Sequence, residues 1–261
     1  MLLLSDINDT ITRCEIEGIR RGIAATRRLY PDEHAEGFDI AGGLAAFTGV
    51  GSPLSQAYGV GSAAPVTDSD VARITAFYES RAAVPRVFVT PLADPSLGVL
   101  LARAGYEPAE YENVLVCDDY SRARRDDRVV ISSDIPAWAR ASAESFLDRT
   151  RLEPGDDKIA TILASSEGVC LLEARNGEAI VATAAMDFCG DCSGLFAGST
   201  MPGYRNRGWH IVMIRDRMAR ARDGGARLLR ATAKPASVSE NNFRRCGFEV
   251  LYTRTLWERA G

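Results

Sequence analysis

The spacing of apolar side chains along the chain predicts alternating helices and strands. Isoleucines recur at helical spacing over residues 6–30, and a capping-box start at Thr67 predicts a second helix to about residue 81. Short apolar runs bounded by glycine or proline predict strands. In this first half the expected strands are 38–50, 54–60, 86–90 and 111–116, and a third helix covers 94–104.

The second half of the chain continues this alternation. Pro136, at the first turn of an apolar-periodic segment, predicts a helix over 135–148. Asn176-Gly177 between two apolar runs predicts a β-hairpin of strands 168–174 and 179–188. The remaining expected elements are a strand at 195–201, a helix from the following loop to Asp223, a strand at 226–233, a short helix at 237–246 and a final strand at 249–257.

The two halves share landmarks at one spacing. Gly247-Phe248 follows Gly105-Tyr106 by 142 residues. The same offset places Val66 on Gly208, the strand 87–89 on 229–231, and Asp94 on Ala236. Several landmarks at a single offset indicate an internal duplication. We therefore expect a first domain over residues 1–117, a charged surface linker over 118–127 and a second domain over 128–261.

Composition and charge are those of an ordinary globular protein. The 261 residues are 46% hydrophobic and 25% charged, with a formal net charge of −4. This charge gives no reason to expect nucleic acid or an anionic membrane as a partner. No apolar run reaches the roughly 18–20 residues of a membrane span, and Met1-Leu2-Leu3-Leu4 is too short for a signal peptide. We expect a cytoplasmic protein.

Cys189-Gly190-Asp191-Cys192 has the spacing of a redox or zinc pair. However, the sequence contains no second pair or histidine cluster that would complete a zinc site. We therefore expect a turn between two strands here, and no metal. Redox or metal chemistry is the alternative.

The stretch from Leu195 to His210 carries the clearest functional signal. An apolar strand runs into a loop that contains glycine and arginine, and an amphipathic helix follows at once. Such a junction directs free backbone N–H groups and the positive end of a helix dipole at one point. That point favours a phosphate or diphosphate.

Two motifs resemble the GNAT acyltransferase superfamily, which binds acetyl-CoA or a longer acyl-CoA. Arg205-x-x-Gly208-x-His210 is similar to its Q/R-x-x-G-x-G/A pyrophosphate loop, except that His210 stands where Gly or Ala is usual. Ser239-x-x-x-Phe243-x-x-x-Gly247-Phe248 is similar to its S-x-x-x-Y-x-x-x-G-F helix, except that Phe243 replaces the tyrosine. Without the elements between them, the first motif would equally fit an ordinary glycine turn before a helix. The order loop–helix–strand–helix–strand resembles the second half of the GNAT fold.

The resemblance implies an α+β fold (mixed α/β) of two GNAT-like halves, each a mixed, mainly antiparallel sheet flanked by helices. Tandem GNAT chains often contain one degenerate half. The first half is expected to be the degenerate one, because Asp68 and Asp70 stand at the helix start where a diphosphate would bind. These carboxylates would repel the ligand, by several kcal/mol at about 4–5 Å and intermediate dielectric.

The resemblance also implies a set of residues for acyl-CoA, which acts as the co-substrate. Ser199 and Met201 would contact the pantetheine arm through their main chain, at a bulge where the strand separates from its parallel neighbour. Trp209 and His210 are expected to shape the phosphate loop. The full expected set is Ser199, Thr200, Met201, Arg205, Asn206, Arg207, Gly208, Trp209, His210, Ser239 and Phe243.

The implied chemistry is direct attack of an acceptor, usually an amine, on the thioester carbonyl. A backbone N–H on the strand 195–201 could stabilise the oxyanion. Phe243 lacks the hydroxyl of the family's usual proton donor, so Tyr204, Ser239, Cys246 or water must protonate the thiolate. Asp187 and Asp191 are the candidate bases; the alternative is that both are solvated turn carboxylates.

Three classes of function fit these observations. The first is an acyltransferase that moves an acetyl or other acyl group from acyl-CoA to a small-molecule acceptor, expected to be an amine, in a ternary complex. The second is a CoA-binding regulatory or non-catalytic protein, which the departures at His210 and Phe243 allow. The third is a scaffold that binds no CoA, which the retained Arg205, Arg207 and Gly208 argue against. As partners we expect the small-molecule acceptor, no nucleic acid and no membrane, and we allow for a homodimer.

Overall fold

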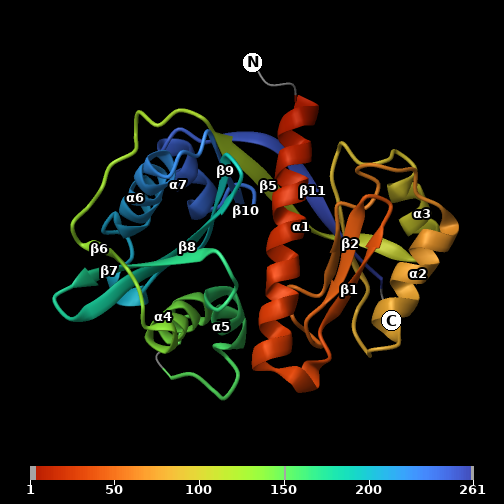
Figure 1. Ribbon diagram of the computed structural model, residues 1–261, viewed down its shortest axis with the longest axis horizontal. Helices are drawn as coiled ribbons and strands as arrows, with labels where there is room; N and C mark the ends of the chain where they lie inside the picture. Colours follow the sequence, from red (N-terminus) through yellow and green to blue (C-terminus); the bar gives the residue numbers. More distant parts are fainter. Residues whose placement is uncertain (1–3, 150, 260–261) are drawn as a thin grey trace. The chain divides into compact units, whose positions relative to one another are not determined.

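The computed structural model describes residues 4–149 and 151–259, so the first three residues of the N-terminal apolar run lie outside the described part (Figure 1). The chain forms two compact units. Unit 1 comprises Met1–Asn113 and Tyr252–Gly261, and unit 2 comprises Val114–Leu251. The chain changes unit within a strand on both occasions, and the linker expected at 118–127 lies inside unit 2.

Unit 1 contains three α-helices and a mixed sheet within its described residues. In chain order its elements are α1 (Leu4–Leu29), η1 (Pro31–Glu33), β1 (Glu36–Ile40), β2 (Gly43–Phe47), β3 (Gln56–Tyr58), α2 (Asp68–Glu79), β4 (Arg86–Val89), α3 (Leu97–Arg103), most of β5 (Tyr106–Cys117) and most of β11 (Glu249–Arg259). The strand order is β1-β2-β3-β4-β11-β5. β3 and β4 pair in parallel, whereas β1–β2, β2–β3 and β4–β11 are antiparallel.

Strand β2 is buried on both of its faces, as alternation along a strand requires when helices cover both sides. Leu44 and Ala46 join a cluster with Ile23 of α1. Ala45 and Phe47 point the other way, into the larger core formed with α2 and α3. The sheet of unit 1 is therefore covered by α1 on one face and by α2 and α3 on the other.

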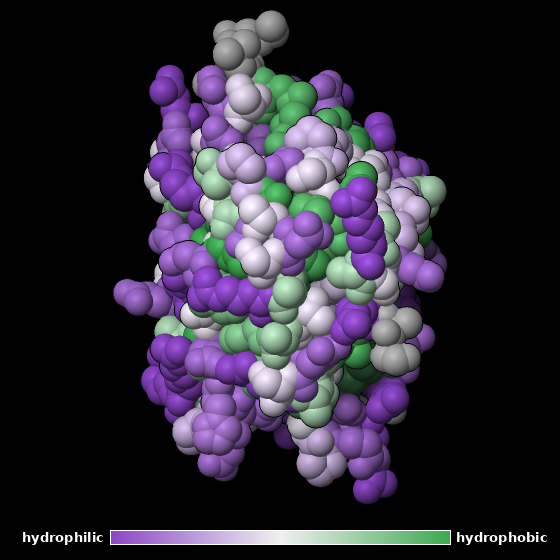
Figure 2. Space-filling view, turned by 90° about the vertical axis from the view of Figure 1, so that its right-hand side faces the viewer, coloured by the Kyte–Doolittle hydropathy of each residue, from purple (hydrophilic) through white to green (hydrophobic). Residues whose placement is uncertain are grey.

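The face of the molecule shown in Figure 2 is largely hydrophilic, with apolar residues visible between polar ones. Helix α2 illustrates the reason, since it buries Val71, Ile74 and Tyr78 and leaves Arg73 exposed. None of the helices in the described part of the chain is long and apolar enough to cross a membrane.

Unit 2 has the strand order β5-β10-β9-β8-β7-β6, again with parallel and antiparallel pairs. Its elements are β6 (Val129–Ile131), α4 (Ile135–Leu147), α5 (Lys158–Ala164), β7 (Val169–Asn176), β8 (Ala179–Cys189), β9 (Cys192–Thr200), η2 (Pro202–Tyr204), α6 (Trp209–Asp223), β10 (Leu228–Ala233) and α7 (Val238–Arg245), with the ends of β5 and β11. β9 and β10 are parallel, and β6 through β9 pair in antiparallel fashion.

The sheet of unit 2 is also covered on both faces. Ala184 and Met186 of β8 pack into the core that includes α6 and α7. Ala185, between them, packs with Trp138 of α4 and Ala160 of α5. The expected fold class, with mixed and mainly antiparallel sheets flanked by helices, is confirmed.

The predicted duplication agrees with the elements observed from β3 onward. An offset of 142 residues places α2 on α6, β4 on β10, α3 on α7 and β5 on β11. The strand expected at 38–50 is instead a hairpin of β1 and β2, because Ala41 and Gly42 turn the chain with φ values of 46° and 84°. Helix α5 and strand β6 were not predicted, since each is short and weakly periodic.

The cysteine pair forms the expected turn. β8 ends at Cys189, β9 begins at Cys192, and the two residues are paired in register. Cys192 is a fully buried free thiol, and burial raises its pKa to about 11.

A buried charge cluster fixes β11 in unit 1. The guanidinium of Arg254, only 6% exposed, donates to Glu15 at 2.6 Å and to Glu112 at 2.6 and 2.8 Å. It also lies over the Phe88 ring, 4.5 Å from the ring centroid. The nearby Tyr252 hydroxyl donates to Asn8 at 2.9 Å. These contacts connect the last strand to residues from the start of the chain.

We expect Arg254→Met to lower the free energy of unfolding by about 3–5 kcal/mol, because it leaves two partly buried carboxylates without their partner. Arg20→Met is the matched control, since the Arg20–Asp39 pair is exposed, at 49% and 74%. Its effect should stay within about 0.5 kcal/mol. Guanidinium chloride denaturation measures both variants, and equal effects would contradict this account of the cluster.

Candidate functional site

The candidate site lies beyond the point where β9 separates from β10, the strand that pairs with it in parallel. β9 and β10 pair from Cys192–Leu228 to Gly194–Arg230, although β9 continues to Thr200 and β10 to Ala233. The two strands therefore separate beyond Gly194. This separation is the splay that the sequence resemblance implied.

A β-bulge lies on the other edge of β9. Thr183 pairs with Ser199 and Ala185 with Phe196, so Ala197 and Gly198 together oppose one residue of β8. Ala197 adopts a left-handed conformation with φ of 48°, which costs a non-glycine residue roughly 1–2 kcal/mol. Such local strain is typical of functional positions.

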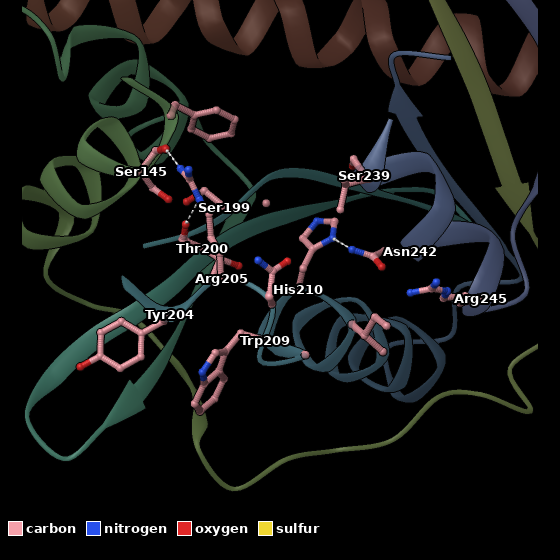
Figure 3. A pocket seen from close by; sticks show the side chains of 16 residues that line it. Ser145, Ser199, Thr200, Tyr204, Arg205, Trp209, His210, Ser239, Asn242 and Arg245 are labelled. Carbon is pink, nitrogen blue, oxygen red and sulfur yellow. Dashed lines mark hydrogen bonds between the residues drawn. The ribbon is translucent and has the colours of Figure 1, made fainter. Parts of the chain in front are cut away.

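A cavity of about 680 Å³ lies beside this bulge, entirely within unit 2 (Figure 3). Its walls come from the end of α4, the end of β9, the loop before α6, the first turn of α6 and helix α7. The lining residues are Ser145, Phe146, Gly198, Ser199, Thr200, Tyr204, Arg205, Asn206, Gly208, Trp209, His210, Ile211, Val238, Ser239, Asn242 and Arg245.

The first turn of α6 faces this cavity without a side-chain cap. Its N-cap residue is Gly208, with φ of 80° and no capping hydrogen bond. The first N–H groups of a helix lack intrahelical partners and carry the positive end of its dipole. In contrast, the equivalent start of α2 is closed by a capping box between Thr67 and Asp70. The two helix starts thus differ as the sequence predicted.

Arg205 fixes the loop before α6. Its guanidinium donates to the Ser145 carbonyl at 2.9 Å (Figure 3). A second hydrogen bond goes to the Asp148 carboxylate at 3.1 Å, and both acceptors lie at the end of α4. It also donates to the Thr200 carbonyl at 3.3 Å. The Arg207 guanidinium lies over the Tyr204 ring, 5.4 Å from its centroid. Arg205 therefore acts first as a connection between the loop, β9 and α4.

His210 is held by two neighbours on α7. Its Nδ1 lies 3.0 Å from the Asn242 side-chain amide, and its ring meets Phe243 edge-on at 6.0 Å (Figure 3). Burial, and secondarily the positive charge of Arg217, lowers the pKa of His210 to about 4. The imidazole is therefore neutral at pH 7. With the Asn242 amide assigned as donor to Nδ1, the proton of the ring lies on Nε2.

The structure brings most of the predicted site residues together. Those that line the cavity are Ser199, Thr200, Tyr204, Arg205, Asn206, Gly208, Trp209, His210 and Ser239. Met201, Arg207 and Phe243 do not line it; Phe243 is 4% exposed and packs on Phe248 behind His210.

Ser199 and Met201, the two residues predicted to contact the pantetheine arm through their main chain, have different surroundings in the structure. The Ser199 hydroxyl is bonded to Thr183 at 2.8 Å, which leaves the Ser199 side chain a structural role. The Met201 N–H donates to the Val181 carbonyl at 2.9 Å. The N–H group of Met201 is therefore already paired within the sheet and is not free for a ligand.

The candidate base Asp187 lies outside the cavity lining. Its carboxylate is 3.0 Å from the Arg230 guanidinium and accepts the Gly194 N–H at 2.9 Å. Only 3% of Asp187 is exposed. It stabilises the paired start of β9 and β10, and it is neither a solvated turn carboxylate nor a group that reaches the cavity.

Sequence reasoning missed several lining residues. Ser145 and Phe146 belong to α4, far away in sequence and without a motif of their own. Asn242 lies one turn after Ser239 on α7, and this helical spacing could have indicated it. Among the residues that the structure describes, no group of three or more His, Cys, Asp or Glu is placed to hold a metal ion.

Comparisons with known proteins point to one fold. The structure is similar to a GCN5-related N-acetyltransferase from Kribbella flavida, with a TM-score of 0.69 and 15% identity over 97% of this chain and 95% of that one. It also resembles an acetyltransferase of the GNAT family from Colwellia psychrerythraea (TM-score 0.54, 12% identity, 89% and 87% covered). A tandem GNAT protein from the clavulanic acid biosynthesis pathway gives a TM-score of 0.54 at 12% identity (74% and 70% covered).

No protein-family model and no curated protein sequence matches the chain. The structural similarities, including one that spans nearly the whole of both chains, show a GNAT fold in a tandem arrangement. The likeness predicted from the phosphate loop and the final helix is thereby confirmed at the level of fold.

The lowered pKa of His210 predicts that the folded protein becomes less stable in acid. Between pH 6.5 and about 4 the unfolded chain binds a proton at this residue that the folded chain does not. The free energy of unfolding should therefore fall as the pH decreases through this window, by up to about 1.4 kcal/mol per pH unit. His210→Phe, which keeps a ring against Phe243, should flatten that slope. NMR titration of the wild-type imidazole tests the premise, and a midpoint near 6.5 would contradict it.

Proposed function

We propose that the protein transfers an acetyl or other acyl group from acyl-CoA to a small-molecule acceptor, expected to be an amine, by direct attack in a ternary complex. One observation carries the proposal: a single cavity is lined both by the end of β9, beyond the point where β9 separates from β10, and by the uncapped start of α6. The GNAT fold supports it, because similar chains are N-acetyltransferases.

In this proposal the diphosphate binds the N–H groups at the start of α6, and the pantetheine arm enters between β9 and β10. Gly208 lets the loop turn, since its φ of 80° is unfavourable for most side chains. Arg205 holds the loop through its bonds to α4 and β9. The capping box of α2 occupies the equivalent position in unit 1, so we propose one CoA site per chain.

The reaction needs a proton for the departing thiolate. Tyr204 and Ser239 line the cavity, whereas Cys246 is fully buried and burial raises its pKa. Figure 3 shows the Tyr204 hydroxyl pointing away from His210. We propose that Tyr204, Ser239 or water in the cavity supplies this proton. Tyr204→Phe and Ser239→Ala separate these sources by their effect on the pH profile of transfer.

A CoA-binding protein without turnover is the second candidate. The observation in its favour is Phe243, which has no hydroxyl and is buried away from the cavity. Thiol release in the presence of an acceptor distinguishes the two functions.

The first test of the site is a matched pair of variants at Gly208. Asn and Asp have the same shape and both tolerate the left-handed conformation, but Asp adds a negative charge at the start of α6. Gly208→Asp should weaken CoA binding at least tenfold more than Gly208→Asn, about 1.4 kcal/mol. Isothermal titration calorimetry should give one site for the wild type. Two sites, or equal affinities of both variants, would contradict the assignment.

The second test is a thiol-release screen. With acetyl-CoA as donor and panels of amines, amino acids and amine antibiotics as acceptors, we expect acceptor-dependent release of CoA. Gly208→Asp should abolish that release at donor concentrations that saturate the wild type. Tight CoA binding with no release from any acceptor would favour the non-catalytic candidate.

A further inference from the structure

Arg217 is a buried cation on α6 with an unusual environment. It is fully buried, and its Nε donates to the Met213 carbonyl at 3.1 Å. Its Nη1 donates to the carbonyls of Ala185 and Phe196 at 3.0 and 3.1 Å, on the two strands that flank the bulge. Within the described chain, its Nη2 has no hydrogen-bond partner. A buried guanidinium donor without an acceptor costs free energy unless something else occupies the site.

The unpartnered Nη2 points to the same place as His210. A Cβ placed on Gly198 would lie 3.3 Å from Arg217 Nη2 and 3.3 Å from His210 Nε2. Apart from the chain neighbours of Gly198, the next nearest atom is His210 Cδ2, at 3.7 Å. Gly198 lines the cavity at the bulge of β9. Two nitrogen atoms therefore meet at the position that a side chain on Gly198 would occupy, and only the lack of that side chain leaves room for another atom there.

The charges at this point favour a partly negative oxygen. Burial lowers the pKa of Arg217 to about 9, so the guanidinium keeps its proton at pH 7. The imidazole of His210 is neutral and, with Asn242 donating to Nδ1, directs an N–H from Nε2. One positive and one neutral donor aimed at a single acceptor is the arrangement of an oxyanion site.

We propose that Arg217 and His210 form a two-donor site over Gly198, which holds the carbonyl oxygen of the bound acyl thioester and the negative charge that develops on it during transfer. This proposal rests on the proposed function and makes Arg217 a catalytic residue. As the acceptor nitrogen forms its bond to the carbonyl carbon, the C=O electron pair moves to the oxygen between Arg217 and His210. The pair then returns and the C–S bond breaks. The thiolate takes a proton from Tyr204, Ser239 or water, and that donor is restored by the proton that the nitrogen loses.

The competing account is that Arg217 is only structural. In that account Nη1 and Nε donate hydrogen bonds to carbonyls around the bulge, and Nη2 does not contact the bound thioester. The two accounts differ at Gly198, where a methyl group would fill the proposed oxygen site, 3.3 Å from Arg217 Nη2 and from His210 Nε2, so that each neighbour has to shift by only a few tenths of an ångström. The hydrogen bonds of Arg217 to Ala185 and Phe196 are made by Nη1 and do not involve the crowded Nη2. Gly198 does not have a positive φ, so alanine introduces no backbone strain there.

The test compares two ligands that differ at the carbonyl. Acetyl-CoA carries the thioester oxygen, and S-ethyl-CoA has the same length without it. By calorimetry we expect the wild type to bind acetyl-CoA about tenfold more tightly than S-ethyl-CoA, as charged hydrogen bonds predict. Gly198→Ala should reduce this preference to within about threefold and retain S-ethyl-CoA binding.

Two further variants complete the design. Gly203→Ala is the matched control: a Cβ there meets no atom within 4 Å, and the preference for acetyl-CoA should remain. Arg217→Met removes the donor and should also abolish the preference; if that variant fails to fold, Gly198→Ala still decides. Once the thiol-release screen has identified an acceptor, Gly198→Ala should lower kcat by about 10²–10³-fold, which is the effect of losing an oxyanion donor.

The outcomes separate this proposal from the proposed function. If the wild type binds both ligands equally well, or if Gly198→Ala keeps the tenfold preference, the two-donor site is overturned and the CoA site stands. If the wild type binds neither ligand, both proposals fail. A preference that disappears in Gly198→Ala and persists in Gly203→Ala supports the site.

Discussion

The constraint on which the site depends is the need to satisfy backbone groups where β9 leaves its neighbours. A buried strand that stops pairing exposes N–H and C=O groups whose burial costs free energy unless partners are found. Here other groups meet that need: Arg217 binds the carbonyls of Ala185 and Phe196, and Arg205 binds that of Thr200. The cavity remains open because these arginines stabilise its edges from α6 and from the loop.

The same constraint explains how the two halves diverged. Both halves place a helix after a strand at the equivalent position, and both helices begin with orphan N–H groups. In unit 1 the side chains of Thr67 and Asp70 satisfy those groups. In unit 2 the helix starts at Gly208 with no cap, so its N–H groups are available to a ligand. Equivalent junctions thus form a capped helix start in unit 1 and an uncapped one, the candidate anion site, in unit 2.

The sequence was informative where the signal is local. The helix start after Gly208, the capping box at Thr67 and the Asn176-Gly177 hairpin are each determined by neighbouring residues, and each was predicted correctly. Residues that meet only in the folded chain were missed, such as Ser145 of α4 against Arg205. The position of Arg217 could have been recognised from the sequence. It falls between Ile214 and Met218 on the apolar face of α6, where a charged residue needs a reason.

The pattern of apolar residues does not predict which unit each strand belongs to. Apolar periodicity shows that β5 and β11 are strands, but it does not show which neighbouring strands they pair with. A division of the chain at the charged segment 118–127 assumes that each half keeps its own last strand. In the structure β11 instead pairs with β4, and Arg254 connects it to Glu15 and Glu112.

That connectivity sets the order in which the protein can be completed during synthesis. The residues of unit 2 form one continuous segment, Val114–Leu251, so all of them have left the ribosome before β11 is finished. The first segment of unit 1 precedes unit 2 in the chain, yet the strand between β4 and β5 is missing until Tyr252 and the residues after it emerge. Unit 1 therefore starts before unit 2 in the chain and is completed after it, and until then the hydrogen-bonding edge of β4 is open to other strands.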